Sequence, residues 1–242
     1  MQQTPSSNAR HAHQSRATEP MQSLRTGLRV LLQFERNRRD FSVTEIAIRT
    51  GLGKSQVSKI LCALVDSGLL VQDPETRSYA VGVRTFALGS RFTSFDGLCQ
   101  AATPIMRDLL QRTRHSVRLS VPYRDKSLYL IGLEGPLFMD TGWHSGSSVA
   151  MAAASAGRVM MAYETPARRA HLLGLAVPQL TPHTVVERTA LERLVADAQE
   201  NGWSIQRHEV VVGLGVISVP LFSGEPQAVG ALSLAFPSHS VG

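Results

Sequence analysis

The sequence predicts an α+β fold in two parts, with a helix-turn-helix and a β-hairpin first and a larger sheet-containing part second. Two helical signals separated by a glycine-containing turn between 42 and 70 predict the helix-turn-helix, and two short β-prone runs between 69 and 82 predict the hairpin. Beyond residue 98, strand-like runs separated by helical runs indicate an α+β or α/β sheet domain. A chain of 242 residues that is 43% hydrophobic is long enough to build a core in each part.

The chain is expected to begin with a tail and a first helix. Residues 1–20 are polar and without hydrophobic periodicity, so we expect them to be disordered. Ser23 precedes several leucines that fit one helical face, which makes Ser23 the expected N-cap of a helix that ends near Arg36 to Asp40. On this interpretation residues 21–82 form the first domain.

The helix-turn-helix follows from local signals. Ser42 and Glu45 have the spacing of a capping box, and the short helix that they start is expected to end at Gly51. A second helix begins near Lys54, with Gly68 as its expected C-cap. Its apolar residues recur at helical spacing and form one buried stripe: Val57, Ile60, Leu61, Leu64 and Val65.

A hairpin and a linker are expected after this helix. The runs Leu69 to Val71 and Ser78 to Val81 surround the turn sequence DPET, and a hairpin at this place forms the wing of a winged helix-turn-helix. Residues 83–98 are again helix-like, with bulky apolar positions, and are expected to form a linker helix.

Residues 99–242 are expected to form the second domain. Helices are predicted at 99–114, 149–163, 166–173 and 186–199, and strands at 117–122, 128–133, 203–211, 215–220 and 229–236. The small-residue run 149–163 is expected to be one helix whose alanines permit close packing or the close approach of a ligand.

The excess positive charge lies in the first part of the chain. Residues 1–95 contain 13 Lys and Arg against 7 Asp and Glu, a net charge of +6, whereas residues 96–242 contain 12 of each kind. This asymmetry favours a polyanion-binding part joined to a neutral part. The alternative is a chance clustering of arginines on a solvated face.

The composition points to no export signal, membrane span or cofactor. No run of 18 apolar residues occurs, and residues 1–20 lack the apolar core of a signal peptide, so we expect a soluble, cytoplasmic protein without membrane contact. The only cysteines, Cys62 and Cys99, have no CxxC partner and indicate neither a disulfide framework nor a zinc site. We expect no cofactor and no metal.

The helix that begins at Lys54 presents polar side chains opposite its apolar stripe. The residues expected to read DNA are Lys54, Ser55, Gln56, Ser58 and Lys59, near the N-terminal end of the helix. Gln56 can pair with adenine, while the lysines neutralise phosphates. Arg77, at the wing turn, is placed to contact the DNA backbone or the minor groove, although a solvated hairpin arginine is nearly as compatible with the sequence.

With these elements in order, the chain resembles the IclR family of bacterial transcriptional regulators over roughly residues 23–237. In the first part the resemblance rests on SLRTGLRVLLQF, VTEIAIRTGLGKSQVSKILCALVDSGLL and DPETRSYAVGVRTFALGSRF. In the second part it rests on GWHSGSSVAMAAASAGRVMMA and GWSIQRHEVVVGLGVISVPLFSGEPQAVGALSLAFP. The order and spacing of all these pieces match the family.

The resemblance implies a winged helix-turn-helix domain, a linker helix and a GAF-like effector-binding domain. It therefore implies a ligand-responsive regulator of a catabolic operon, which binds double-stranded operator DNA and a small-molecule effector. It also implies a homodimer formed through the DNA-binding halves, which pairs further into a tetramer through the effector domains.

Matching the family pattern residue by residue places an effector site at Val149, Ser155, Ala156, Gln206, Val216, Ser233 and Ala235. The chain departs from the pattern where Val216 replaces a frequent cysteine, Gln206 an acid and Ala235 the second serine of a Ser-x-Ser. Each change removes a polar group or a charge, so we expect an aromatic or partly apolar organic acid. Ser155, Ser233 and backbone amides are expected to hold its carboxylate, with Arg158 or His208 as further candidates for its charge, and simple packing is the alternative for the two serines.

Two other classes of function are an enzyme and a DNA-binding protein without an effector. No G-x-S-x-G, HExxH, GxGxxG or P-loop pattern occurs, so an enzyme is not expected. The remaining alternative is a DNA-binding regulator whose C-terminal domain serves oligomerisation without a ligand.

Overall fold

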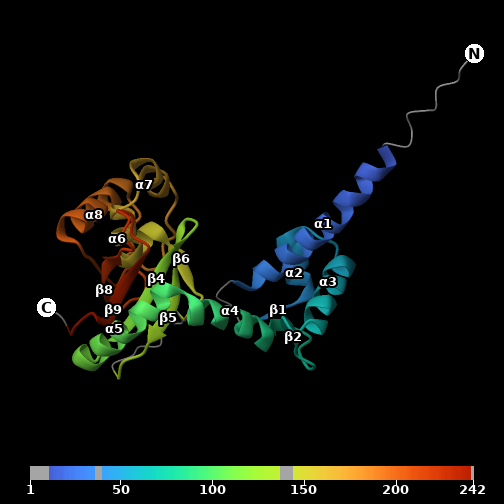
Figure 1. Cartoon of the computed structure of the whole chain (residues 1–242), viewed down its shortest axis with the longest axis horizontal. Helices are drawn as coiled ribbons and strands as arrows, with labels where there is room; N and C mark the ends of the chain where they lie inside the picture. Colours follow the sequence, from blue (N-terminus) through green and yellow to red (C-terminus); the bar gives the residue numbers. More distant parts are fainter. Residues whose placement is uncertain (1–10, 36–39, 137–143, 241–242) are drawn as a thin grey trace, which may run out of the picture. The chain divides into compact units, whose positions relative to one another are not determined.

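The computed structural model describes residues 11–35, 40–136 and 144–240 and divides into two compact units, Met1–Ser90 and Arg91–Gly242. Each unit has its own buried core, and Figure 1 labels their helices and strands. Both units combine helices with an antiparallel sheet, so the predicted α+β class is confirmed. Among the helices of the described residues, none is long and apolar enough to cross a membrane.

The first unit is a group of helices with a small sheet at its side. Its helical elements are α1 (His11–Leu31), the 3-10 turn η2 (Leu32–Glu35), α2 (Val43–Thr50), α3 (Lys54–Asp66) and the beginning of α4 (Val83–Phe95). Its strands are β1 (Asp40–Phe41), β2 (Leu70–Gln72) and β3 (Tyr79–Val81), paired antiparallel in the order β1-β3-β2. Strands β2 and β3 confirm the predicted hairpin, whereas β1 was not expected from the sequence.

The start of α2 has the predicted capping box. The Ser42 hydroxyl accepts a hydrogen bond from the Glu45 backbone N–H at 3.3 Å, and a Glu45 carboxylate oxygen accepts one from the Ser42 N–H at 2.9 Å. Gly51 ends the helix in the left-handed region at φ 69°, where a side chain would be strained. At the end of α3 the C-cap is Ser67, and the expected Gly68 follows it at φ 75°.

The apolar stripe of α3 is buried as predicted. Val57 and Leu61 are fully buried, and Ile60, Leu64 and Val65 are partly buried against the same core. This core also takes residues from α1, η2, α2 and the small sheet, among them Val30, Phe34, Phe41, Ile46, Leu70 and Tyr79. Burial of the stripe fixes the opposite side of α3 toward solvent.

The structure corrects the predicted start of the first helix. Helix α1 begins at His11, so Ser23 lies inside the helix and does not cap it, and residues 11–20 are helical. The residues before Ser23 include good helix formers, which a search for a capping serine overlooks: Ala12, Gln14, Arg16, Ala17 and Glu19. The helix ends at Leu31, earlier than expected, and residues 1–10 and 36–39 lie outside the described ones.

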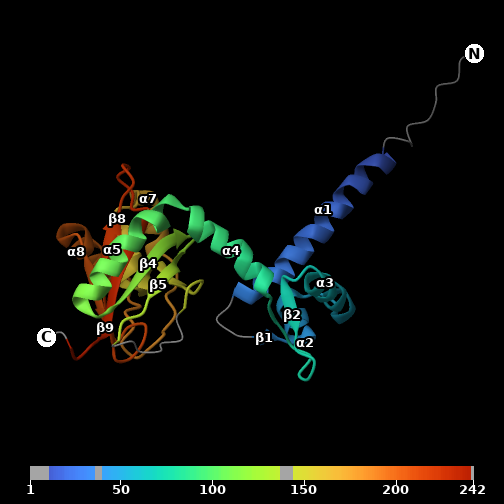
Figure 2. The same cartoon turned by 60° about the horizontal axis from the view of Figure 1, so that its bottom comes forward.

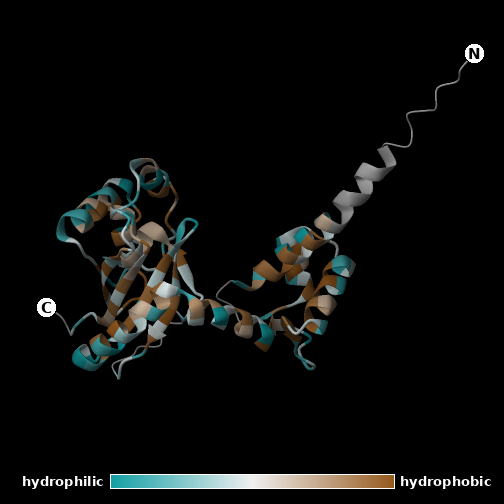
Figure 3. Ribbon diagram, in the orientation of Figure 1, coloured by the Kyte–Doolittle hydropathy of each residue, from teal (hydrophilic) through white to brown (hydrophobic). Residues whose placement is uncertain are grey.

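The structure has one helix, α4, over most of the expected linker 83–98, and a second helix follows it directly. Helix α4 ends at Phe95, and the Asp96 carboxylate then accepts a hydrogen bond from the Cys99 N–H at 2.9 Å as the N-cap of α5 (Gly97–Thr113). Helix α4 carries exposed apolar side chains, of which Val83, Phe86 and Phe95 are more than 70% exposed. The ribbon of α4 includes segments coloured as hydrophobic in Figure 3.

The second unit is a six-stranded antiparallel sheet with helices on both faces (Figure 2). Its strands, β4 (Ser116–Tyr123), β5 (Lys126–Leu133), β6 (Ser148–Ala150), β7 (Ser204–Arg207), β8 (Leu214–Leu221) and β9 (Gly230–Pro237), lie in the order β6-β5-β4-β9-β8-β7. Helix α5 packs on one face; α6 (Ser155–Ala162), α7 (Pro166–Leu173) and α8 (Arg188–Asn201) lie toward the other.

The two faces of this sheet differ in chemistry because side chains alternate along each strand. Val117, Leu119 and Leu232 face α5 and form an apolar core with Met106. The residues between them on the same strands face α6 and, apart from Arg118, are all small: Ser116, Arg118, Ser120, Ala231, Ser233 and Ala235. The α6 side of the sheet therefore has room for a cavity.

Two predicted elements of the second unit are corrected. Residues 149–163 do not form one helix, because the chain runs through β6 and the 3-10 turn η3 (Met151–Ala153) before α6 starts. Gly157 permits this fold, since a Cβ there would meet the Met151 carbonyl oxygen at 1.8 Å. The strand expected at 203–211 ends at Arg207 because His208 adopts a left-handed φ of 64° and starts a turn.

Candidate functional site

The candidate DNA-reading surface lies at the N-terminal end of α3. Lys54, Ser55, Gln56 and Lys59 are exposed there, and Ser58 is half-buried. Helix α3 has no side-chain N-cap bond and no acidic residue in its first turn. Its first backbone N–H groups and the helix dipole therefore favour an anion such as a phosphate.

The wing residue Arg77 lies next to a compact turn. The Asp73 carboxylate accepts hydrogen bonds from the Glu75 and Thr76 N–H groups at 2.8 and 2.9 Å, which fixes the turn. Arg77 then adopts a left-handed φ of 59° and is exposed. The wing thus presents a cation outside the small sheet.

The second candidate site is a row of side chains that crosses the sheet of the second unit. Cross-strand register places Arg118 of β4 opposite Ser233 of β9, and Ser233 opposite Ser218 of β8. The Ser218 hydroxyl shares hydrogen bonds of 2.8 Å with those of Ser233 and of Ser155, which is the first residue of α6. We refer to Arg118, Ser233, Ser218 and Ser155 as the polar row.

Three residues of the polar row, Arg118, Ser233 and Ser155, line a small inner cavity of about 10 Å³ between the sheet and the start of α6. Ser155, Ala156, Gln206, Val216 and Ser233, five of the seven residues that the sequence assigned to the effector site, line this cavity. A volume of this size holds about one water molecule and no organic acid. The inner cavity in this structure is therefore too small for the expected effector.

The remaining two predicted residues lie beside the cavity without lining it. Val149 is buried in a small core with Ala153 and Val210, and Ala235 is buried opposite Val216 in the sheet. The residues that complete the lining were missed: Arg118, Tyr129, Ala154, Val210 and Leu214. The one signal for Arg118 in the sequence was a charged residue inside the strand-like run 117–122.

The lining combines polar groups with an uncapped helix start. Ala154 and Ser155 lie at the start of α6, where no side chain caps the free N–H groups. The Gln206 side-chain oxygen is buried and has no hydrogen-bond partner among the described residues. An unsatisfied polar group of this kind is costly, and a bound molecule with a donor group relieves it.

A second, more open pocket of about 290 Å³ adjoins the inner cavity. Arg118 and Tyr129 line both spaces and so lie at the boundary between them. Burial raises the pKa of the Tyr129 phenol above its usual value, an effect that the nearby Arg118 partly offsets. The phenol therefore stays protonated at neutral pH and keeps its donor.

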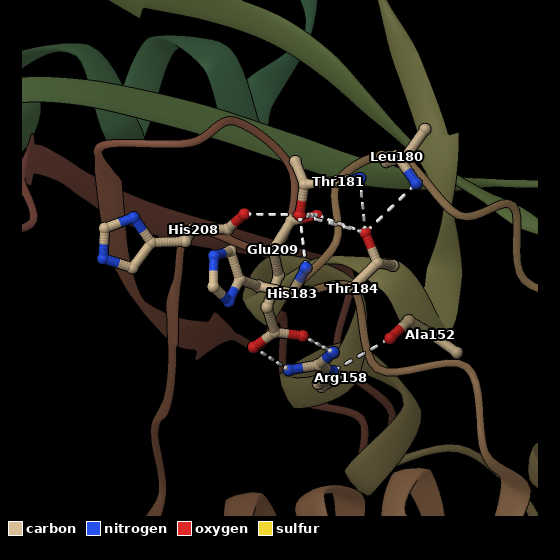
Figure 4. Close-up of polar contacts among 8 residues, drawn as sticks. All are labelled: Ala152, Arg158, Leu180, Thr181, His183, Thr184, His208 and Glu209. Carbon is tan, nitrogen blue, oxygen red and sulfur yellow. Dashed lines mark hydrogen bonds and ion pairs between the residues drawn. The ribbon is translucent and has the colours of Figure 1, made fainter.

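The structure corrects the two candidates for binding a ligand's charge. Arg158 is fully buried and donates to both carboxylate oxygens of Glu209, at 3.1 and 2.5 Å, and to the Ala152 carbonyl at 2.9 Å (Figure 4). Its charge and donors are thus already used within the protein. Neither Arg158 nor His208 lines the inner cavity.

His208 belongs to the same network as Glu209. Its Nδ1 accepts a hydrogen bond from the Gly213 N–H at 2.9 Å, and its ring lies 5.3 Å from that of His183. The Thr181 hydroxyl donates to the His208 carbonyl at 2.7 Å, and the Thr184 hydroxyl donates to the Glu209 carbonyl at 2.6 Å (Figure 4). This network fixes the turn that carries Val210 to the wall of the cavity.

Both units match models of known protein families. The family model of the bacterial transcriptional regulator IclR C-terminal domain matches residues 92–241, and that of the IclR helix-turn-helix domain matches residues 23–74. The transcriptional regulator XynR of Escherichia coli is 26% identical over 216 residues, which cover 89% of this chain and 86% of XynR. The repressor AllR of the same species is 24% identical over 226 residues, 92% of this chain and 82% of AllR.

Solved structures show the same fold. An IclR regulator from Alicyclobacillus acidocaldarius superposes with a TM-score of 0.80 at 23% identity, over 91% of this chain and 89% of that chain. An IclR homologue from Microbacterium hydrocarbonoxydans, solved in complex with 4-hydroxybenzoate, gives a TM-score of 0.74 at 26% identity and covers 89% of each chain. With its helix-turn-helix, its sheet domain and these matches, the chain belongs to the IclR family of bacterial transcriptional regulators.

Proposed function

We propose that this regulator controls a catabolic operon, that α3 reads its operator, and that its C-terminal unit binds a small organic acid that is aromatic or partly apolar. The observation that carries the effector part is the inner cavity, where an uncapped helix start and hydroxyl groups meet apolar walls. Donors of this kind bind a carboxylate, while the walls suit an apolar body.

Operator reading by α3 is supported by the exposure of its polar residues at the uncapped N-terminal end. The side chain of Gln56 can reach a base edge in the major groove, and Lys54 and Lys59 can neutralise phosphates. Ser55 and Ser58 contact either bases or phosphates, and Arg77 extends the contact from the wing.

Gln56→Ala and Lys59→Ala test this assignment. Each variant should lose most of its binding to a DNA fragment from the promoter of its own gene, with an unchanged melting temperature, because both side chains are exposed. Lys126→Ala, which removes an exposed positive charge in the second unit, is the matched control. Normal operator binding by both α3 variants, measured by fluorescence anisotropy, would reject this reading surface.

An aromatic acid as effector is supported by the loss of polar groups in this chain at Val216, which is partly buried and lines the inner cavity, and at Ala235, which is buried opposite it in the sheet. It is also supported by the homologue from Microbacterium hydrocarbonoxydans, which was solved with 4-hydroxybenzoate. The inner cavity must widen for such a ligand. The adjoining pocket of about 290 Å³ offers space for an aromatic body once the boundary at Arg118 and Tyr129 moves.

The small inner cavity also favours a second candidate, a C-terminal unit that only assembles copies of the chain. A thermal-shift panel of benzoate, 4-hydroxybenzoate, glyoxylate and pyruvate separates the two. We expect the aromatic acids to raise the melting temperature, because a ligand stabilises the state that it binds. Stabilisation by the two-carbon and three-carbon oxoacids alone rejects the ligand class, and no response to any compound favours the assembly function.

The proposed homodimer, pairing further into a tetramer, is supported by the exposed apolar residues of α4. Helix α4 exposes a large hydrophobic area at Val83, Phe86 and Phe95. An exposed apolar area of this kind is typical of a surface that contacts another protein chain. Light scattering of the full chain should give a dimer or tetramer, and Phe86→Glu should shift it toward monomer. A monomeric wild-type protein at micromolar concentration contradicts this proposal.

A further inference from the structure

Arg118 is a buried cation with little to neutralise it. Its side chain is 8% exposed, and its ion contact with Glu134 is 4.0 Å long, to a carboxylate that is 42% exposed. Within the described residues this is the only polar partner of its guanidinium, and the other contact is the Tyr129 ring, 5.7 Å from the guanidinium carbon. An ion pair of this length to a partly exposed carboxylate is weak, so most of the free-energy cost of burying the Arg118 charge is not offset.

Arg158 shows that a buried arginine in this unit can have its charge compensated within the protein. Arg158 is the other deeply buried arginine of this unit, and it makes three hydrogen bonds, two of them to Glu209. A buried arginine that stabilises structure is satisfied in this way. Arg118 keeps donors available.

The position of Arg118 is fixed by the sheet. It lies in register between Gly132 of β5 and Ser233 of β9, so its neighbour on one side has no side chain to occupy the adjacent space. The arginine stem therefore has room between the inner cavity and the adjoining pocket, both of which it lines. A ligand that spans the two spaces must pass it.

We infer that Arg118 is the specificity-determining residue that makes the effector site select a carboxylate. The ligand's carboxylate accepts hydrogen bonds from the guanidinium, the contact with Glu134 is given up, and the ligand's apolar body lies beside Tyr129 and Ile131 in the adjoining pocket. The planar guanidinium suits a carboxylate because it can donate two parallel hydrogen bonds. This inference rests on the proposed effector site and names the group that reads the ligand's charge there.

The test compares acids with their neutral amides on the full-length protein. Benzoate and 4-hydroxybenzoate are paired with benzamide and 4-hydroxybenzamide, which have nearly the same shape, and dissociation constants are measured by calorimetry. The wild-type protein should bind each acid about 10- to 100-fold more tightly than its amide, as a charge-assisted hydrogen bond implies. Arg118→Gln should reduce this preference to about threefold or less through weaker binding of the acid, whereas Arg118→Lys should retain part of it.

Glu134→Gln provides a second measurement that does not depend on changing a buried residue. Because Glu134 competes with the ligand for Arg118, its removal should raise the affinity for the acids about two- to fivefold and leave the affinity for the amides unchanged. Glu192→Gln on α8 removes another partly exposed carboxylate and is the control for a general charge effect. Equal gains in both variants would count against the inference.

The outcomes distinguish this inference from the proposed function. If no acid or amide binds the wild-type protein, the proposed effector site and this inference are both rejected. If the acids bind but Arg118→Gln keeps the wild-type acid-to-amide preference, the proposed effector site is retained and Arg118 is not the residue that recognises the ligand's carboxylate. If Arg118→Gln does not fold, the Glu134→Gln pair decides, and an unchanged acid affinity overturns the inference.

Discussion

Glu209 and Arg158 show how one side chain can support a cavity wall without touching a ligand. Their ion pair joins α6 to the turn after β7, and that turn carries Val210 to the inner cavity. Because Arg158 is fully buried, its charge depends on Glu209 for compensation.

Glu209→Gln is therefore expected to destabilise the protein by about 3–5 kcal/mol, since it leaves a buried guanidinium without its counter-charge. Urea unfolding of the full chain measures this effect. The exposed pair Arg188–Glu192, with a comparable 2.9 Å distance, supplies the control, and Glu192→Gln should change stability by less than about 1 kcal/mol. Similar effects of the two substitutions would contradict the role given to the buried pair.

The two cysteines should differ in reactivity. Burial and the Asp96 carboxylate raise the pKa of the Cys99 thiol to about 11, so it remains protonated at pH 8, whereas Cys62 is exposed on α3. Only the thiolate reacts with iodoacetamide. Mass spectrometry of the native protein at pH 8 should show one alkylated cysteine, Cys62, and two after unfolding; rapid labelling of Cys99 in the native state would refute this.

At the scale of elements, local signals were the most reliable guide to the fold. The capping box at Ser42 and the glycine at 51 placed α2 correctly, because both act through hydrogen bonds and backbone angles of a few adjacent residues. The run 149–163 was misassigned because its alanines give no periodicity, and the close approach of Gly157 to Met151 is not visible in a pattern of hydropathy.

The capping box offers a test of this element. Ser42→Ala should cost about 1 kcal/mol in the unfolding free energy of the first unit, because it leaves a backbone N–H of α2 without its acceptor. Glu45→Ala removes the reciprocal bond, and the double variant should cost less than the sum of the two, since the residues share one motif. Strict additivity would show that the two bonds act independently.

The proposed effector site shows why some of its lining residues could not be predicted. Ser155, Gln206 and Ser233 were found through the resemblance, but Arg118 joins them only through the register between β4 and β9. Register joins residues more than a hundred positions apart, and no local pattern encodes it. The small volume of the inner cavity, about 10 Å³, is likewise a result of packing.

At the scale of the whole molecule, the charge asymmetry distinguishes the part of the chain proposed to bind DNA from the part proposed to bind the effector. The net charge of +6 in residues 1–95 and of zero in residues 96–242 predicts that operator affinity is strongly dependent on salt. Plotted on logarithmic axes against salt concentration, the operator affinity should fall linearly, and Lys59→Ala should lower the slope by about 1. Fluorescence anisotropy across a salt series measures it, and an unchanged slope would remove Lys59 from the phosphate contacts.

The polar row has a consequence for how such sensors diversify. Three of its members, Arg118, Ser233 and Ser218, lie on strands of a sheet whose opposite face packs on α5, and the backbone hydrogen bonds of the strands do not depend on which side chains occupy these positions. Exchanging one or two of these side chains alters what the cavity accepts while the scaffold keeps its hydrogen-bonded frame. If the proposed effector site is correct, its ligand preference can therefore change by point mutation along a single line across the sheet, without rebuilding the domain that holds it.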